Sequence, residues 1–361
     1  MASKGIIATG DQHLKPQTWG NRPELRGDAE RAFNSIVDLC IAGEYDLLLM
    51  GDAFNANHPD SQSVVAFRQG IARLHAAGAK VWAIQGQHDA AIPPWPVAVA
   101  DTIDYVHGKT FRPFGKEGPV FYALDCNKNS AALDEACHAV PKEASVFVGH
   151  QLAETAFPLE GVWNFSIDWL PDNIRLVLLG DYHKAVDYDV RGRHLYYSGS
   201  TYMCSITEDS DKSVLRLVLN VKGQIEVDRV PIPSRPCERV QVFTAAELTA
   251  AEARLQQLVA SVKPDQPMPL FHVTYTPNVE KVVERLSMLA GSKVYLWPSP
   301  KAMRFQEDEA EGKPMEYTGE KPTLDGCLRS VASGQAYRLA ADLLQGDADV
   351  VLANARKSFG L

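Results

Sequence analysis

The sequence lacks the long apolar run that a membrane-spanning helix requires. None of its hydrophobic stretches approaches the ~18–20 residues that cross a bilayer, and the longest, at 46–50 and 176–179, have the length of strands. The opening residues MASKGIIA do not have the pattern of a secretory signal peptide. We therefore expect a cytoplasmic protein with no membrane partner.

Paired cysteines and an excess of positive charge are also missing. The six cysteines are scattered with no C-x-x-C spacing, which argues against a zinc ribbon or a redox motif and favours reduced thiols. Lys and Arg number 36 against 45 Asp and Glu, a formal net charge of -9. An acidic chain is not drawn to nucleic acid by its overall field. Binding to nucleic acid would therefore need a local patch, metal ions or a partner.

What the sequence does contain is a globular composition, with 45% hydrophobic and 22% charged residues in 361. Strand-like and helix-like segments alternate in the first 90 residues, which predicts βαβ crossovers and a buried, largely parallel sheet. Further strands and two hairpins follow. The predicted strands lie at 4–9, 46–50, 80–84, 120–124, 145–148, 175–179, 186–189, 194–198, 213–220 and 224–230, and the helices at 27–43 and 61–77.

A proline-rich segment after residue 230 is typical of a linker. Beyond it, strands at 239–243, 270–275 and 293–297 alternate with helices at 245–262 and 278–289. The predicted fold class is therefore α/β, in two parts. We expect domains at 1–232 and 237–300, a charged loop at 301–322 and a helical tail at 323–361.

Five short motifs share one design, because each follows a buried strand and offers metal-ligand side chains. In order they are Asp11-x-His13, Gly51-Asp52, Gly86-Gln87-His88-Asp89, Gly149-His150 and Gly180-Asp181-x-His183. Ligands bind beyond the carboxyl ends of strands in open α/β sheets, so these five loops can converge on one site. A lone Asp-x-His or Gly-Asp is more often ordinary turn chemistry, and Gly-Gln-His-Asp is stronger evidence, but it is the ordered set of five that indicates function.

The pooled side chains exceed what a single metal ion needs. They comprise three carboxylates, three or four imidazoles and one amide, a set that suits manganese, iron, zinc or nickel better than calcium. Two ions ~3.5–4 Å apart, bridged by a carboxylate, would use them all and would clamp a phosphate between them. The sequence therefore predicts a two-metal phosphoester hydrolase.

These motifs resemble those of the calcineurin-like metallophosphoesterases, which read D-x-H, G-D-x-x-(D/N), G-N-H-(D/E), G-H and G-H-x-H. The resemblance spans residues 5 to about 205. It implies a four-layer α/β sandwich and two divalent cations, Mn²⁺ above all, with Mg²⁺ as the other choice. Two positions depart from the pattern, since Gln87 replaces Asn and Asp181 replaces the first His of G-H-x-H. Both substitutions keep a ligand atom, and the Asp favours manganese or magnesium over zinc.

The resemblance implies a role for each matched residue. One metal would be held by Asp11, His13, Asp52 and His183, and the other by Asp52, Gln87, His150 and Asp181. His88 would give a proton to the leaving oxygen or contact the phosphate, and Asp89 would orient it. Asn55 lies where members involved in DNA repair place a side chain near the active-site histidine or the substrate.

Within this superfamily the chain resembles the SbcD-type nuclease subunit, particularly its phage versions. In that family a small βαβαβ domain caps the DNA, and a helical tail binds the coiled-coil base of an SbcC-like ATPase. The resemblance thus implies a DNA exonuclease and endonuclease of recombination, repair or replication, in a bacterial or phage-infected cell. It also suggests pairing of two copies through helices of the phosphoesterase domain.

Two other functions stay open on the sequence alone. One is a stand-alone phosphatase or nucleotide phosphodiesterase with the same metal chemistry, which would leave residues 238–361 without a clear purpose. The other is a non-catalytic scaffold with a decayed site. The motivation for it is that Gln87 and Asp181 depart from the family's metal-ligand pattern.

Overall fold

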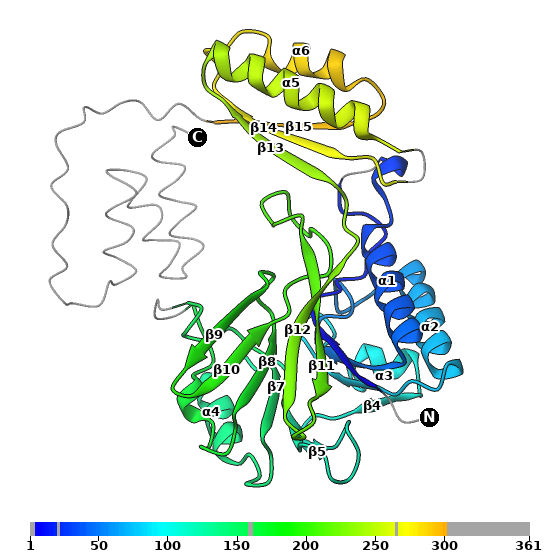
Figure 1. Cartoon of the computed structure of the whole chain (residues 1–361), viewed down its shortest axis with the longest axis vertical. Coiled ribbons are helices and arrows are strands. Elements are labelled where there is room, and N and C mark those ends of the chain that lie inside the picture. The colour runs from blue at the N-terminus through cyan, green and yellow to red at the C-terminus, as the bar shows by residue number, and fades with distance from the viewer. Residues whose placement is uncertain (1–3, 20–21, 158–161, 264–265, 302–361) are drawn as a thin grey trace, which may run out of the picture. The chain divides into compact units, whose positions relative to one another are not determined.

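The computed structural model describes residues 4–19, 22–157, 162–263 and 266–301 (Figure 1). The predicted tail at 323–361 and all but one residue of the predicted loop at 301–322 lie outside these ranges. In the described residues, no helix has both the length and the apolar character needed to cross a membrane.

The first sheet is six-stranded, in the order β12-β11-β1-β2-β3-β4. Its strands are β1 (Gly5–Thr9), β2 (Tyr45–Met50), β3 (Val81–Ile84), β4 (Ile103–Tyr105), β11 (Lys212–Leu219) and β12 (Ile225–Ile232). The strands from β1 to β4 are parallel, as the βαβ pattern predicted. The hairpin β11–β12 adds to the other side of β1 in the antiparallel sense, so the sheet is mixed.

The second sheet is also six-stranded and mixed, in the order β5-β6-β7-β8-β10-β9. Its strands are β5 (Lys109–Phe111), β6 (Phe121–Ala123), β7 (Val146–His150), β8 (Leu176–Gly180), β9 (Val186–Val190) and β10 (Arg193–Tyr197). The central strands β6, β7, β8 and β10 run parallel to one another. Its carboxyl edge therefore presents the residues that follow β7 and β8.

Three apolar clusters define four layers. Alternate residues of the two sheets, among them Ile6, Leu48, Val148 and Leu178, pack on each other in one cluster. The opposite face of the first sheet packs on α1 (Asp28–Gly43) and α2 (Ser61–Ala76), which lie side by side in Figure 1. The opposite face of the second sheet packs on α4 (Ser130–His138). The order helix, sheet, sheet, helix confirms the predicted sandwich.

Short elements complete this part of the chain. They are η1 (Pro23–Leu25), α3 (Trp95–Val99) and η2 (Ile167–Trp169). Sequence patterning predicted neither α3 nor α4, since both are short and α4 buries only Leu133 and Cys137.

The region after the proline-rich segment forms a separate three-stranded parallel sheet with its own apolar core. Its elements are β13 (Cys237–Val242), α5 (Ala245–Ser261), β14 (Leu270–Tyr275), α6 (Val282–Ala290) and β15 (Tyr295–Pro300). All strand pairs are parallel, which makes the unit a βαβαβ fold as predicted. We call residues 237–300 the three-stranded unit.

Candidate metal centre

The five motifs meet because the carboxyl ends of the parallel strands of both sheets lie next to one another. Asp11 follows β1 and Asp52 follows β2, and the Asp11 amide donates to the Gly51 carbonyl at 3.1 Å. The second sheet joins them through Asp181, whose amide donates to Asp11 Oδ2 at 3.1 Å. His150 at the end of β7 reaches across to the Met50 carbonyl, 2.7 Å from its Nδ1. The structure thus gathers side chains from strands far apart in the chain.

The His150 contact fixes which ring nitrogen is available. A carbonyl oxygen can only accept, so Nδ1 carries a proton, and the lone pair that the ring can offer in its neutral form is on Nε2, which faces the site. That Nε2 is fully buried without a hydrogen-bond partner, and so is Asp52 Oδ2, 3.4 Å away. Buried polar atoms are rarely left unpaired. Two such atoms facing one another fit a cation between them.

A second pair of nitrogens converges nearby. His13 Nε2 and His183 Nε2 are 2.9 Å apart, and Asp11 Oδ1 lies 3.7 Å from the first and 3.8 Å from the second. Ligand atoms of Asp11, His13 and His183 form one group, and those of Asp11, Asp52 and His150 form another, each within 4.8 Å. Asp52 also groups with His13 and His88. Asp11 is thus common to the first two groups. Asp52, which the resemblance assigns to both metals, has its Oδ2 3.4 Å from His150 Nε2 and 3.7 Å from His13 Nε2.

The two departures from the family motifs meet each other. Gln87 donates through Nε2 to Asp181 Oδ1 at 3.1 Å, and the same oxygen is 3.9 Å from His150 Nε2. The amide and carboxylate are therefore beside the group that contains His150. All seven predicted ligands are brought to one place: Asp11, His13, Asp52, Gln87, His150, Asp181 and His183.

Charge in the site is concentrated and shielded from water. Burial alone would raise the pKa of Asp52, but the neighbouring His150 and His13 outweigh it and lower that pKa to about 2. Burial likewise disfavours a charged His150, yet Asp52, Asp11 and Asp181 raise its pKa well above the usual range. Buried carboxylates that draw positive charge this strongly make a site for cations.

The backbone at these positions is unusual. Four of the candidate ligands, Asp11, His13, Asp52 and Asp181, have positive φ angles of 56°, 40°, 54° and 83°. Non-glycine residues in this region cost of order ~1–3 kcal/mol each and are concentrated at functional sites. Glycine before the ligand supplies the room, because a Cβ on Gly51 would lie 2.4 Å from His150 Nδ1.

His88 lies at the open side of the site. Its amide donates to Asp52 Oδ1 at 2.8 Å, its Nε2 is 3.8 Å from Asp52 Oδ2, and its side chain is 40% exposed. Burial lowers the pKa of His88, and the nearby imidazoles add to this against the opposing charge of Asp52. The ring thus remains accessible to a bound substrate, next to the candidate ligands.

Asp89 has a different environment from the one the sequence suggested. Its carboxylate is fully buried and accepts from the amides of Ala53, Phe54 and Gly86 at 3.1, 3.0 and 3.3 Å. These bonds hold the loop after β2 to the loop after β3, and they do not involve the His88 ring. Asn55 is half-buried, and its backbone N–H donates to the Leu14 carbonyl at 3.3 Å.

Sequence reasoning missed Glu208. This carboxylate accepts from His183 Nδ1 at 2.8 Å. Burial would raise the pKa of Glu208, but the hydrogen bonds from His183 and Lys212 lower it to about 2. Glu208 belongs to a loop with no motif, 25 residues beyond its partner, so no spacing in the sequence could have indicated the contact.

The sandwich is the fold that the resemblance to the calcineurin-like metallophosphoesterases implied, and the predicted side chains lie at its strand ends, including the two departures Gln87 and Asp181. No family model matches the chain. The chain is 27% identical over 247 residues to the DNA double-strand break repair protein Mre11 of Haloferax volcanii, covering 67% of this chain. It is 24% identical over 268 residues to the protein of the same name from Methanosarcina mazei, covering 71% of this chain.

The similarity to the Mre11 proteins agrees with the expected likeness to an SbcD-type subunit. The alignments cover 55% and 42% of the two relatives, so this chain spans about half their length. Among solved structures, an archaeal phosphodiesterase matches with a TM-score of 0.35 and 11% identity, over 63% of this chain and 99% of that one.

Proposed function

We propose that this protein is a metal-dependent DNA nuclease that hydrolyses phosphodiester bonds and acts with an SbcC-like ATPase. The observation that carries the proposal is the pair of buried, unpartnered atoms Asp52 Oδ2 and His150 Nε2, surrounded by five more potential ligands. A phosphoester hydrolase needs such a site to hold divalent cations. The name of the relatives, which are repair proteins for DNA double-strand breaks, supports DNA as the substrate.

The ligands divide between two cations in this proposal. Asp11, His13, Asp52 and His183 would hold one ion, and Asp52, Gln87, His150 and Asp181 the other. When bound, Mn²⁺ or Mg²⁺ supplies charge neutralisation for the phosphate and an activated water. The carboxylate-rich set favours these ions over zinc.

The three remaining candidate residues would act without binding a metal ion. His88 is exposed enough to reach a bound phosphodiester and would give a proton to the leaving oxygen. Asp89 holds the loops that carry Asp52 and His88 at a fixed separation through its three amide bonds. We assign it this positioning role in place of an orienting bond to His88, and Asn55 a contact with the substrate.

Each segment of the chain would have a different role in this proposal. Residues 1–232 would cut the DNA and residues 237–300 would bind it, while residues 323–361 would bind the ATPase. Because the net charge of this chain is -9, the ATPase would provide much of the DNA-binding surface. Two copies would pair through helices of the first domain. We place the protein in the cytoplasm of a bacterial or phage-infected cell.

The test is cleavage of end-labelled linear duplex DNA with Mn²⁺, with and without the cognate ATPase. We expect Asp52→Ala to lose both bound metal and cleavage. We expect His88→Ala to keep its metal and lose about 10²–10⁴ in rate, the usual contribution of a general acid. His75→Ala is the matched control, since His75 is exposed on α2.

Other outcomes would reassign the protein. Hydrolysis of nucleotides or of a model phosphodiester without cleavage of DNA would make it a stand-alone phosphodiesterase. A wild-type chain that binds no metal and cuts no substrate would be a scaffold. Deletion of residues 323–361 with full retention of ATPase binding would contradict the role given to the tail.

A further inference from the structure

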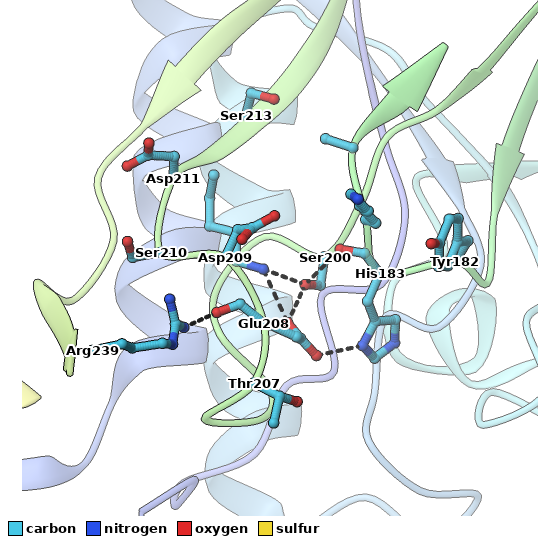
Figure 2. Close-up of a pocket in the computed structure, with 13 residues that line it drawn as sticks. Tyr182, His183, Ser200, Thr207, Glu208, Asp209, Ser210, Asp211, Ser213 and Arg239 are labelled. Carbon is cyan, nitrogen blue, oxygen red and sulfur yellow. Dashed lines mark hydrogen bonds and ion pairs between the residues drawn. The ribbon is translucent and has the colours of Figure 1, made fainter. Parts of the chain in front are cut away.

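A loop outside the five motifs contacts one of the candidate metal ligands. This segment, residues 204–211, lies between β10 and β11, and Figure 2 shows Glu208 within it pointing at His183. Glu208 Oε1 is 2.8 Å from His183 Nδ1. An ionised carboxylate only accepts, so Nδ1 donates. The lone pair of the neutral ring is then on Nε2, the atom 2.9 Å from His13 Nε2.

The second oxygen of Glu208 is held as firmly as the first. Lys212 Nζ donates to Oε2 at 3.0 Å, Ser200 Oγ at 2.8 Å and the Cys204 amide at 3.1 Å. The Lys212 side chain is only 4% exposed. Three donors on one oxygen fix the carboxylate plane, so Glu208 has one orientation in which to meet the imidazole.

The same contacts argue against a further cation at this place. Ligand atoms of His183, Cys204 and Glu208 lie close enough together to hold a metal. However, the Lys212 ammonium already neutralises Glu208, and His183 Nδ1 is turned to it as a donor. A third cation would have to displace both.

The backbone of the loop is tied to the three-stranded unit. Arg239 of β13 donates from Nε to the Ile206 carbonyl at 2.9 Å and from Nη2 to the Glu208 carbonyl. Figure 2 shows Arg239 reaching the peptide of Glu208 from the side opposite His183. One residue thus meets a candidate metal ligand with its side chain and the three-stranded unit with its backbone.

We infer that Glu208 is a positioning residue that fixes the tautomer and orientation of His183 for metal binding, and that Arg239 holds Glu208 in place. The inference rests on the proposed metal centre. Carboxylates that accept from a metal-bound histidine orient the ring and raise its basicity. Metal affinity is therefore sensitive to how the three-stranded unit holds this loop.

The test is Mn²⁺ binding to the full chain by isothermal titration calorimetry. We expect Glu208→Gln to weaken binding about 10–100-fold, the usual effect of losing such a partner. Whichever way the new amide turns, its NH₂ group faces a donor, either His183 Nδ1 or Lys212. Asp209→Asn is the matched control, because it removes a neighbouring exposed carboxylate from the same loop and should bind as the wild type does.

A second measurement separates positioning from a structural role. In the Co²⁺-loaded chain, the imidazole N–H protons of bound histidines give hyperfine-shifted NMR resonances. We expect Glu208→Gln to lose one of these to solvent exchange, and Arg239→Lys to weaken Mn²⁺ binding less than Glu208→Gln does.

A folded Glu208→Gln chain with wild-type Mn²⁺ affinity and the full set of resonances would overturn the inference, even if its melting temperature were lower. A wild-type chain that binds no Mn²⁺ would overturn the metal centre itself.

Discussion

At the scale of single residues, Gly86 is the glycine of the candidate metal centre with the least room for a side chain. A Cβ at this position would lie 2.1 Å from Asp52 Oδ1 and 2.3 Å from the Asp52 amide nitrogen. Since one of these atoms is backbone, the clash cannot be relieved by a change of rotamer. The close approach lets the loop after β3 lie directly on Asp52, one of the candidate ligands.

We predict that Gly86→Ala lowers the free energy of unfolding by about 1–3 kcal/mol, the usual cost of overpacking, and abolishes tight Mn²⁺ binding. Gly78→Ala is the control, since a Cβ there meets nothing within 4 Å but the φ is +81°. It should lower stability and leave metal binding unchanged. Chemical denaturation and calorimetry check both, and wild-type Mn²⁺ affinity in Gly86→Ala would contradict the prediction.

The candidate ligands were predictable because each directly follows a buried strand, so that the sequence alone places Asp11, Asp52 and Asp181 at one edge of the fold. Their neighbours were not. Asp89 follows His88 in the sequence, but its carboxylate turns away to three amides of the loops. Glu208 has no motif around it at all. Such contacts depend on how loops fold in space, which spacing does not encode.

At the scale of elements, α5 begins with a complete capping box. Thr244 Oγ1 accepts from the Glu247 amide at 3.2 Å, and Glu247 Oε2 accepts from the amides of Phe243 and Thr244 at 2.7 and 2.9 Å. These bonds, above all the one from Phe243, lower the pKa of Glu247 in the folded chain. The charged carboxylate is therefore the form that stabilises the start of the helix.

We predict that this contribution depends on pH. The folded pKa lies below the unfolded value, so the stabilisation is complete above the ordinary Glu range near ~4.3 and is lost as pH falls through the folded pKa. Glu247→Gln should increase amide exchange in α5 at pH 7, and the difference from wild type should vanish in acid. Hydrogen exchange by mass spectrometry measures it, with Glu280→Gln as the exposed control. An equal difference at every pH would be evidence against the charged cap.

Most elements could be predicted from periodicity, and β14 has the predicted bounds. Helix α6 begins at Val282, later than the predicted 278, because residues 278–281 form a turn that ends in Lys281 with a φ of 58°. The pairing of β11 with β1 was not predictable from local pattern. It joins residues more than 200 positions apart, and local patterning carries no information on such a partner.

At the scale of the molecule, a buried ion pair joins α1 to the segment before the three-stranded unit. Arg235 Nε and Nη2 donate to the two oxygens of Asp28, each at 2.8 Å, and Trp19 Nε1 donates to Oδ2 at 2.7 Å. Arg235 is 3% exposed and Asp28 7%. Arg31 also pairs with Asp28, so it is the removal of Asp28 that would leave a charge, the Arg235 guanidinium, buried without its carboxylate.

We predict that Asp28→Asn lowers the free energy of unfolding by about 3–5 kcal/mol, the usual cost of breaking a buried pair. The double variant Asp28→Leu with Arg235→Met should cost much less, because it leaves no buried charge behind and Arg31, the other partner of Asp28, is exposed to solvent. Urea denaturation of the full chains measures both. A single variant as stable as the wild type would show that water reaches the guanidinium.

The pairing of β1 with β11 also has a consequence for the order in which the protein forms. During synthesis β1 and β2 emerge early, but the edge of β1 stays unsatisfied until residues 212–219 have left the ribosome. Contacts this distant in sequence slow folding and expose strand edges meanwhile. The candidate ligands Asp181 and His183 also emerge late, so a nascent chain has only part of its metal site. The full set of proposed ligands is therefore assembled only after β8 and the residues that follow it have joined the second sheet.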